Sequence, residues 1–144
     1  MTPTFLRSGM AALACAAAIA FASPSMAAMV NLKASLDSKV EVPANDSKGT
    51  GTLTASFDTD SKKLTWKGSS SGLSGPATAA HFHAGEPGKN GGVVIPITGA
   101  DKGTFEGTAT LTDAQASDMM AGKWYVNIHT AAFKGGEIRG QLTK

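Results

Sequence analysis

The chain is poor in cysteine, in histidine and in long apolar runs. Its one cysteine, Cys15, lies near the N-terminus, so no intrachain disulfide can form. One cation, Arg7, precedes the apolar run AALACAAAIAFA and the small residues of SPSMA. This order is typical of a secretory signal peptide cleaved after Ala27, because a membrane span needs about 20 apolar residues. We therefore expect a signal peptide at residues 1–27 and one periplasmic or secreted domain at residues 28–144, with no membrane span after cleavage.

Acylation of Cys15 within ALAC is an alternative interpretation of the same segment. It would leave the apolar stretch AAAIAFA on the mature protein and shorten the core of the signal, so we favour cleavage after Ala27. Cleavage removes the only thiol. An exported domain without disulfides must then be held together by packing, by strand pairing or by a metal.

An excess of charge of one sign is also lacking, since 13 Lys and Arg stand against 11 Asp and Glu. No basic cluster is interleaved with aromatic residues, so nothing points to a nucleic-acid partner. The G-x-S-x-G motif and the glycine-rich phosphate loop are absent. Glu86 is the only carboxylate near the paired histidines, which leaves paired-carboxylate catalysis unsupported. These absences favour a binding module over an enzyme.

Glycine is abundant, with 17 residues, and it separates short stretches in which apolar and polar residues alternate. GTLTASFD (51–58) and LTWKGSS (64–70) predict a hairpin. Thr112 and Gln115 form a capping box for a short helix that ends at Gly122. We expect an all-β sandwich of Greek-key or immunoglobulin-like type with one short helix. The expected strands span residues 30–36, 39–43, 51–58, 64–70, 77–85, 93–98, 104–112, 123–130 and 136–143.

The chain has three histidines: His81 and His83 in AAHFHAG, and His129 in YVNIHT. Side chains alternate along a strand with a rise of ~3.3 Å per residue, so His81 and His83 share a face about 6 to 7 Å apart. If the strand at 123–130 lies beside the strand at 77–85, His129 supplies a third nitrogen. Three imidazoles suit copper or zinc, with a fourth position left open or taken by water.

The same alternation places four further polar residues near these histidines. Glu137 or Asn127 could fix the tautomer of a histidine ring. We interpret Arg139 as the ion-pair partner of Glu137 and Tyr125 as a sheet-packing residue. The loop at 85–92 has ordinary turn chemistry, and its alternative role is to rim the histidine site.

Two other functions use the same residues. A metal-free module that binds an envelope protein or a glycan would have splayed histidines beside an exposed apolar patch of several hundred Å². A metal-dependent oxidoreductase would need convergent imidazoles together with an accessible pocket and a proton donor. A metal-binding module needs only the convergence of three nitrogens around one point about 2 Å from each.

Several motifs together resemble the CHRD domain, first described in chordin, in its single-domain bacterial secreted form. They cover nearly the whole chain after the signal and read EVP (41–43), SGLSG (71–75), AHFHAG (80–85), NGGVV (90–94), AGKWYVNIHT (121–130) and GGEIRGQL (135–142). The resemblance implies a β-sandwich similar to immunoglobulin or superoxide dismutase folds. Copper/zinc superoxide dismutase also holds copper with an H-x-H pair, so the analogy implies copper at His81, His83 and His129.

The chain also departs from these relatives. It has no fourth or bridging histidine and no disulfide, so the resemblance does not extend to dismutase activity. The antagonism of bone morphogenetic proteins by chordin does not carry over either, because this chain lacks the cysteine-rich modules that bind the ligand there.

Overall fold

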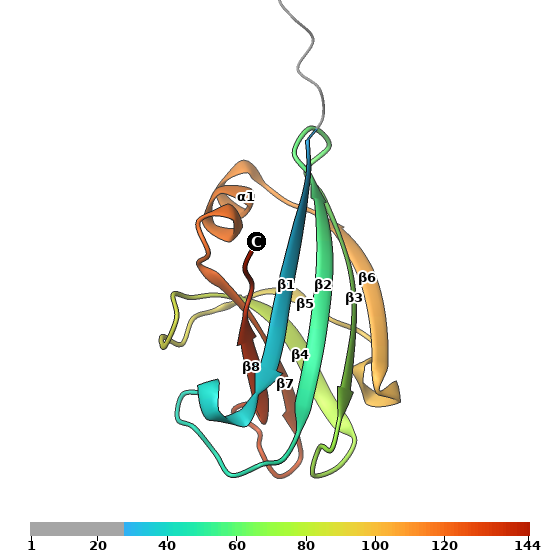
Figure 1. Ribbon diagram of the computed structural model, residues 1–144, viewed down its shortest axis with the longest axis vertical. Coiled ribbons are helices and arrows are strands. Elements are labelled where there is room, and N and C mark those ends of the chain that lie inside the picture. Colours follow the sequence, from blue (N-terminus) through green and yellow to red (C-terminus); the bar gives the residue numbers. More distant parts are fainter. Residues whose placement is uncertain (1–27) are drawn as a thin grey trace, which may run out of the picture.

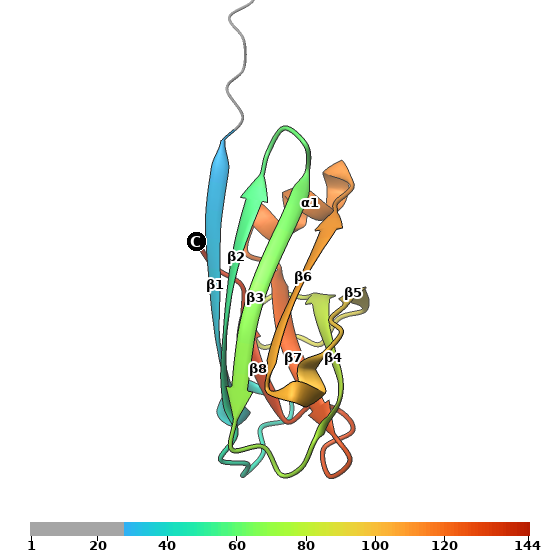
Figure 2. The same cartoon turned by 90° about the vertical axis from the view of Figure 1, so that its right-hand side faces the viewer.

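The computed structural model describes residues 28–144, so the expected signal peptide at 1–27 lies outside the described residues. Within residues 28–144, eight antiparallel strands form one sheet that is nearly closed into a barrel, with one α-helix at one end (Figures 1 and 2). None of the helices in this part has the length and apolar character needed to span a bilayer. The elements are β1 (Met29–Asp37), η1 (Ser38–Val40), β2 (Thr50–Asp58), β3 (Lys63–Ser71), β4 (Ala77–Ala84), β5 (Val93–Pro96), η2 (Ala100–Lys102), β6 (Thr104–Thr110), α1 (Asp113–Met120), β7 (Trp124–Thr130) and β8 (Ile138–Gln141).

The order of strands in the sheet is β5-β4-β7-β8-β1-β2-β3-β6. The predicted hairpin β2–β3 is present, β7 pairs with β8, and β4 lies beside β7, as a three-histidine site requires. The all-β class and the short helix are therefore confirmed. The Greek-key or superoxide-dismutase-like form of a sandwich stays a prediction.

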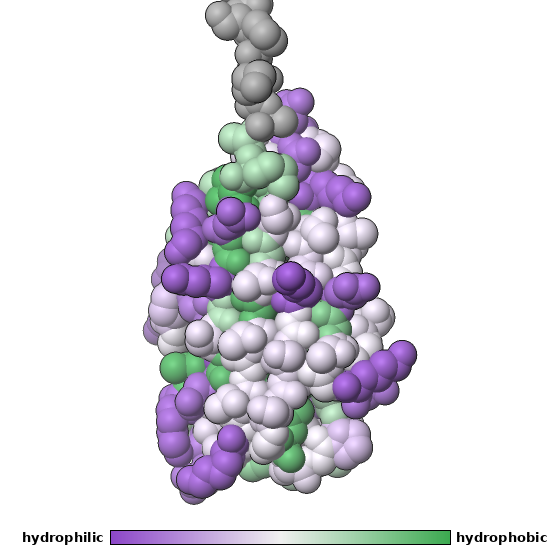
Figure 3. Space-filling view, turned by 45° about the vertical axis from the view of Figure 1, so that its right-hand side comes forward, coloured by the Kyte–Doolittle hydropathy of each residue, from purple (hydrophilic) through white to green (hydrophobic). Residues whose placement is uncertain are grey.

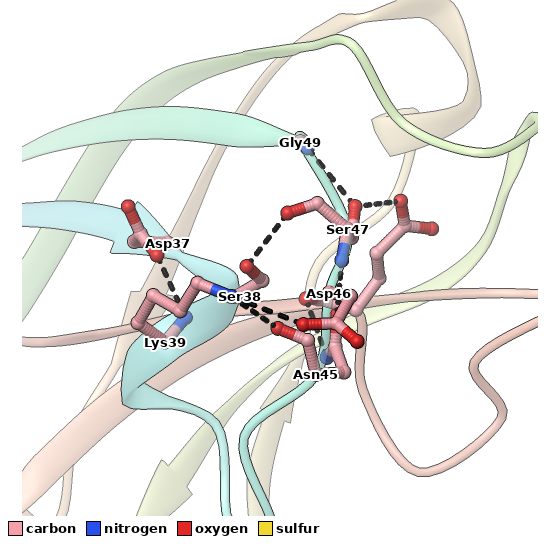
Figure 4. A network of polar contacts seen from close by, with 8 residues as sticks. Asp37, Ser38, Lys39, Asn45, Asp46, Ser47 and Gly49 are labelled. Atoms are coloured by element: carbon pink, nitrogen blue, oxygen red, sulfur yellow. Dashed lines mark hydrogen bonds and ion pairs between the residues drawn. The ribbon is translucent and has the colours of Figure 1, made fainter.

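The strand predicted at residues 39–43 is wrong. The side chain of Asp37 accepts a hydrogen bond from the backbone N–H of Lys39 at 2.7 Å, which turns the chain into η1 at the end of β1. The chain then crosses the outside of the sheet, where Ser38 donates to the carbonyl of Ser47 (Figure 4). The stretch from Ser38 to Gly49 thus becomes a cover for part of the sheet.

Alternation in the strands builds the core as predicted. Leu53, Phe57, Leu64 and Trp66 are all buried, and the Trp66 ring meets the ring of Phe82 edge-on with centroids 5.1 Å apart. Full burial of a side chain such as Phe82 contributes about 1.5–3 kcal/mol. The other face of the same strands is left for polar side chains.

The helix α1 begins at the predicted capping box. Thr112 accepts from the backbone N–H of Gln115 at 3.2 Å, and its own backbone N–H donates to Oε1 of Gln115 at 2.9 Å. Met119 is buried and fixes the helix against the barrel.

Candidate metal centre

Strands β4 and β7 bring the three histidines together on the side of the sheet that faces away from the core. In their antiparallel register His81 pairs with Asn127, His83 with Tyr125, and His129 with Ala79. Because Ala79 has a small side chain, it leaves room for the ring of His129 to lean diagonally toward His81. The convergence therefore follows from the period of the strands and from this register.

The nitrogen atoms of the three rings are close enough to share one ion. Nδ1 of His81 lies 3.2 Å from Nε2 of His129, and one ligand nitrogen from each of the three histidines lies within 4.8 Å of the others. An ion about 2.0–2.1 Å from each nitrogen in trigonal or tetrahedral geometry holds the nitrogens about 3.3–3.6 Å apart. The His81–His129 pair already has roughly this spacing, and the ligand nitrogen of His83 would have to move closer to complete the set.

Two backbone carbonyls fix the tautomers of two of the rings. Nδ1 of His83 lies 2.9 Å from the carbonyl oxygen of Gly91, and Nδ1 of His129 lies 2.9 Å from the carbonyl oxygen of Lys134. A carbonyl only accepts, so both Nδ1 atoms carry the proton and both Nε2 atoms keep a lone pair, which at His129 accepts from Nδ1 of His81 at 3.2 Å. Nε2 of His83 is buried and has no hydrogen-bond partner in the described part of the chain. This pattern is the one that metal-ligating histidines require.

Burial also favours the neutral form of His81 and His129. Desolvation, followed by the neighbouring rings of His129 and His83, lowers the pKa of His81 below its ordinary value. Desolvation lowers the pKa of His129 as well, partly opposed by its hydrogen bond to Lys134. Neutral imidazoles at neutral pH are ready to bind a metal without first releasing a proton.

The polar face around the histidines is covered rather than exposed to solvent. The ring of Tyr125 stacks on His83 with centroids 4.8 Å apart and planes 5° apart, and the guanidinium of Arg139 lies 3.4 Å from the centre of the Tyr125 ring. Arg139 donates to Oδ1 of Asn90 at 3.0 Å and to the carbonyl of Lys89 at 2.6 Å. These bonds hold the loop at 85–92 against the sheet, so this loop contacts the histidine site.

Glu137 lies in a separate network. It is fully buried and accepts hydrogen bonds from Ser47, Thr130 and both the backbone N–H and the hydroxyl of Ser74. Burial alone would raise the pKa of Glu137, but these hydrogen bonds outweigh it and place the pKa below its ordinary value. The predicted ion pair with Arg139 is not among the contacts found in residues 28–144, nor is a hydrogen bond from a histidine ring to Glu137.

Sequence reasoning missed the carbonyls of Gly91 and Lys134, because a backbone carbonyl has no residue type to reveal it. The signal that could have found the first is Gly91 itself, since a Cβ at this position would overlap the carbonyl of Ala84 at the end of β4. Glu41 was also missed, because its segment was predicted to be a strand. Glu41 is a buried residue of the covering segment, and desolvation raises its pKa although the charge of Arg139 opposes the shift.

The comparisons with known proteins agree with the motif analysis. The CHRD domain family model matches residues 32–142, a range that contains all three histidines and the loop at 85–92 that contacts them. No curated protein and no solved structure matches the chain.

Proposed function

The chain belongs to the CHRD domain family, and we propose that it binds one transition-metal ion, copper in the first place, through His81, His83 and His129. The observation that carries this proposal is the convergence of the ligand nitrogens within 4.8 Å. The carbonyls that hold the protons of His83 and His129 on Nδ1, and so keep a lone pair on each Nε2, give it further support.

The chemistry of the donors favours copper or zinc over harder ions. All three donors are imidazole nitrogens, whereas calcium and magnesium prefer oxygen ligands. The H-x-H pair on a strand resembles the copper ligands of superoxide-dismutase-like sandwiches, which is our reason to place copper before zinc.

Export is part of the proposal. The segment at 1–27 has the order of a signal peptide, so we place the domain in the periplasm or outside the cell, as a single-domain secreted bacterial member of the family. An envelope protein or a glycan would then be a natural partner for a metal-handling module there.

The surface gives less support to the metal-free interaction module. In residues 28–144 the large exposed apolar side chains are Met29, Val40 and Val93, which belong to three different elements. On the face seen in Figure 3, pale residues dominate, hydrophilic residues are scattered among them, and the green areas are small. A docking surface of several hundred Å² would need a contiguous apolar patch.

The proposal is tested by titrating the chain from Ala28 to Lys144, which contains every described element, with Cu(I), Cu(II) and Zn(II). We expect one ion per chain in the wild-type protein. The His81→Ala/His83→Ala variant should lose more affinity than the about 10- to 100-fold that removal of an outer partner costs. Asn31→Ala, on the exposed face of β1, is the matched control and should bind as the wild type does. Absence of binding by the wild-type protein, or equal binding by the histidine variant, would refute the proposal.

A further inference from the structure

Asn127 occupies the centre of the polar face. It pairs in register with His81 on β4 and with Arg139 on β8, and Tyr125 and His129 lie two residues away on either side of it along β7. Two of these four neighbours belong to the histidine triad. By strand register, Asn127 therefore lies next to the space between His81 and His129.

The amide oxygen of Asn127 receives no hydrogen bond from the described part of the chain. The residue is only 3% exposed, and its Oδ1 is buried and has no hydrogen-bond partner in the described part of the chain. An unpaired buried acceptor costs about 1–3 kcal/mol. A bound group that donates a hydrogen bond to this oxygen would remove that cost.

The donor end of the Asn127 amide lies near Glu41. A Cβ at Gly136 would contact both Oε1 of Glu41 and Nδ2 of Asn127, so the donor end of the amide lies on the side of the carboxyl group. The reverse orientation would put two acceptors side by side, because the carboxylate and the amide oxygen both accept. Oδ1 is at the other end of the same planar amide, away from Glu41.

A site with three histidine ligands leaves one position open, which water occupies in comparable metal centres. We propose that Oδ1 of Asn127 accepts a hydrogen bond from the ligand at this fourth position, so that the site selects ligands that carry a proton, such as water, over ligands that carry none, such as azide. This inference rests on the proposed metal site. It would make Asn127 a positioning residue that determines which small molecule reaches the ion.

The test is a titration of the Cu(II)-loaded protein with azide, followed by the azide-to-copper absorption band. In the wild-type protein azide must displace a water that Asn127 holds. Loss of one neutral hydrogen bond is worth about 0.5–1.5 kcal/mol, so azide should bind about 2- to 12-fold more tightly to Asn127→Ala. Asn127→Leu, which lacks the acceptor but fills the space, should show the same gain, and Asn31→Ala should show none.

Unchanged azide affinity in Asn127→Ala and Asn127→Leu would overturn the inference, and so would a gain in the alanine variant alone, since added space would then be the cause. If neither variant folds, pulsed electron paramagnetic resonance of the wild-type Cu(II) protein in heavy water decides the matter. A deuteron of a water bound directly to copper, coupled more strongly than the exchangeable N–H deuterons of the imidazole ligands, supports the inference, and its absence refutes it. A wild-type protein that binds no metal refutes the proposed function itself, which the metal titration detects separately.

Discussion

The buried side chains of Glu137, just before β8, and Arg139, within it, form hydrogen bonds to neutral groups. Glu137 accepts only from serine and threonine side chains and one backbone N–H, while Arg139 donates to an amide oxygen and a backbone carbonyl. Alternation along the strands predicts correctly that these residues face away from the core. It cannot predict their burial, because the segments that cover them come from distant parts of the sequence.

The first residue-scale prediction concerns Glu137→Gln. The amide keeps one acceptor but puts an NH₂ group against hydroxyls that now donate to a carboxylate, so buried donors lose their partners. We expect the free energy of unfolding to fall by about 1–3 kcal/mol, measured by urea denaturation at neutral pH. Glu106→Gln, on the exposed face of β6, is the matched control and should change it by less than about 0.5 kcal/mol. Equal effects of the two substitutions would contradict the role of the Glu137 network.

The same carboxylate predicts a pH dependence. The pKa of Glu137 in the folded protein lies below its ordinary value, so the unfolded chain takes up a proton at higher pH than the folded one. The stabilisation is complete above the unfolded pKa of about 4.3 and is lost as the pH falls through the folded pKa. The difference in unfolding free energy between wild type and Glu137→Gln should therefore be constant near neutrality and shrink below about pH 4. A difference that widens in acid would show that the sign is wrong.

The helices and strands that could be predicted are those whose signals all lie within one short stretch of sequence. The β2–β3 hairpin follows from two alternating stretches around a polar turn, and α1 follows from its capping box at Thr112. The stretch at 39–43 also alternates, yet the side-chain bond of Asp37 to the backbone of Lys39 turns it out of the sheet. A pattern of alternation alone does not reveal such a competing hydrogen bond.

At the scale of the elements, we predict that Arg139 holds the loop at 85–92 against the sheet. Arg139→Lys keeps the charge but cannot form two hydrogen bonds and a stacking contact with Tyr125 together. Loss of one charge-assisted hydrogen bond, about 1.5–3 kcal/mol, should speed hydrogen exchange of the Gly91 amide about tenfold or more. The amides of Leu53 and Trp66, in the distant β2–β3 hairpin, are internal controls. Exchange that rises equally in the loop and the hairpin would indicate general destabilisation instead of a released loop.

At the scale of the whole molecule, the site depends on one strand neighbourhood. The motifs that contain His83 and His129 are far apart in the sequence and meet because β4 and β7 are adjacent in the sheet. Periodicity fixes which residues share a face of a strand but does not order the strands. The candidate ligands could therefore be named from the sequence, whereas their convergence and the two carbonyls behind them required the structure.

Export gives a prediction for the whole chain. Expressed in a Gram-negative host, the full-length chain should appear in the periplasmic fraction with Ala28 as its first residue, as measured by mass spectrometry of the intact protein. Cys15→Ser should be processed in the same way. Processing that is blocked by Cys15→Ser, or a lipid attached to Cys15, would favour the acylated form instead.

X-ray absorption spectroscopy of the metal-loaded protein from Ala28 to Lys144 tests the three-histidine site most directly. Both the Cu(I) and the Zn(II) forms should show scattering from three imidazole rings, with metal–nitrogen distances of about 2.0–2.1 Å in the zinc form. His129→Ala should reduce the number of rings by one. A spectrum with fewer than three imidazoles in the wild-type protein, or one that His129→Ala leaves unchanged, would contradict a metal centre built from His81, His83 and His129.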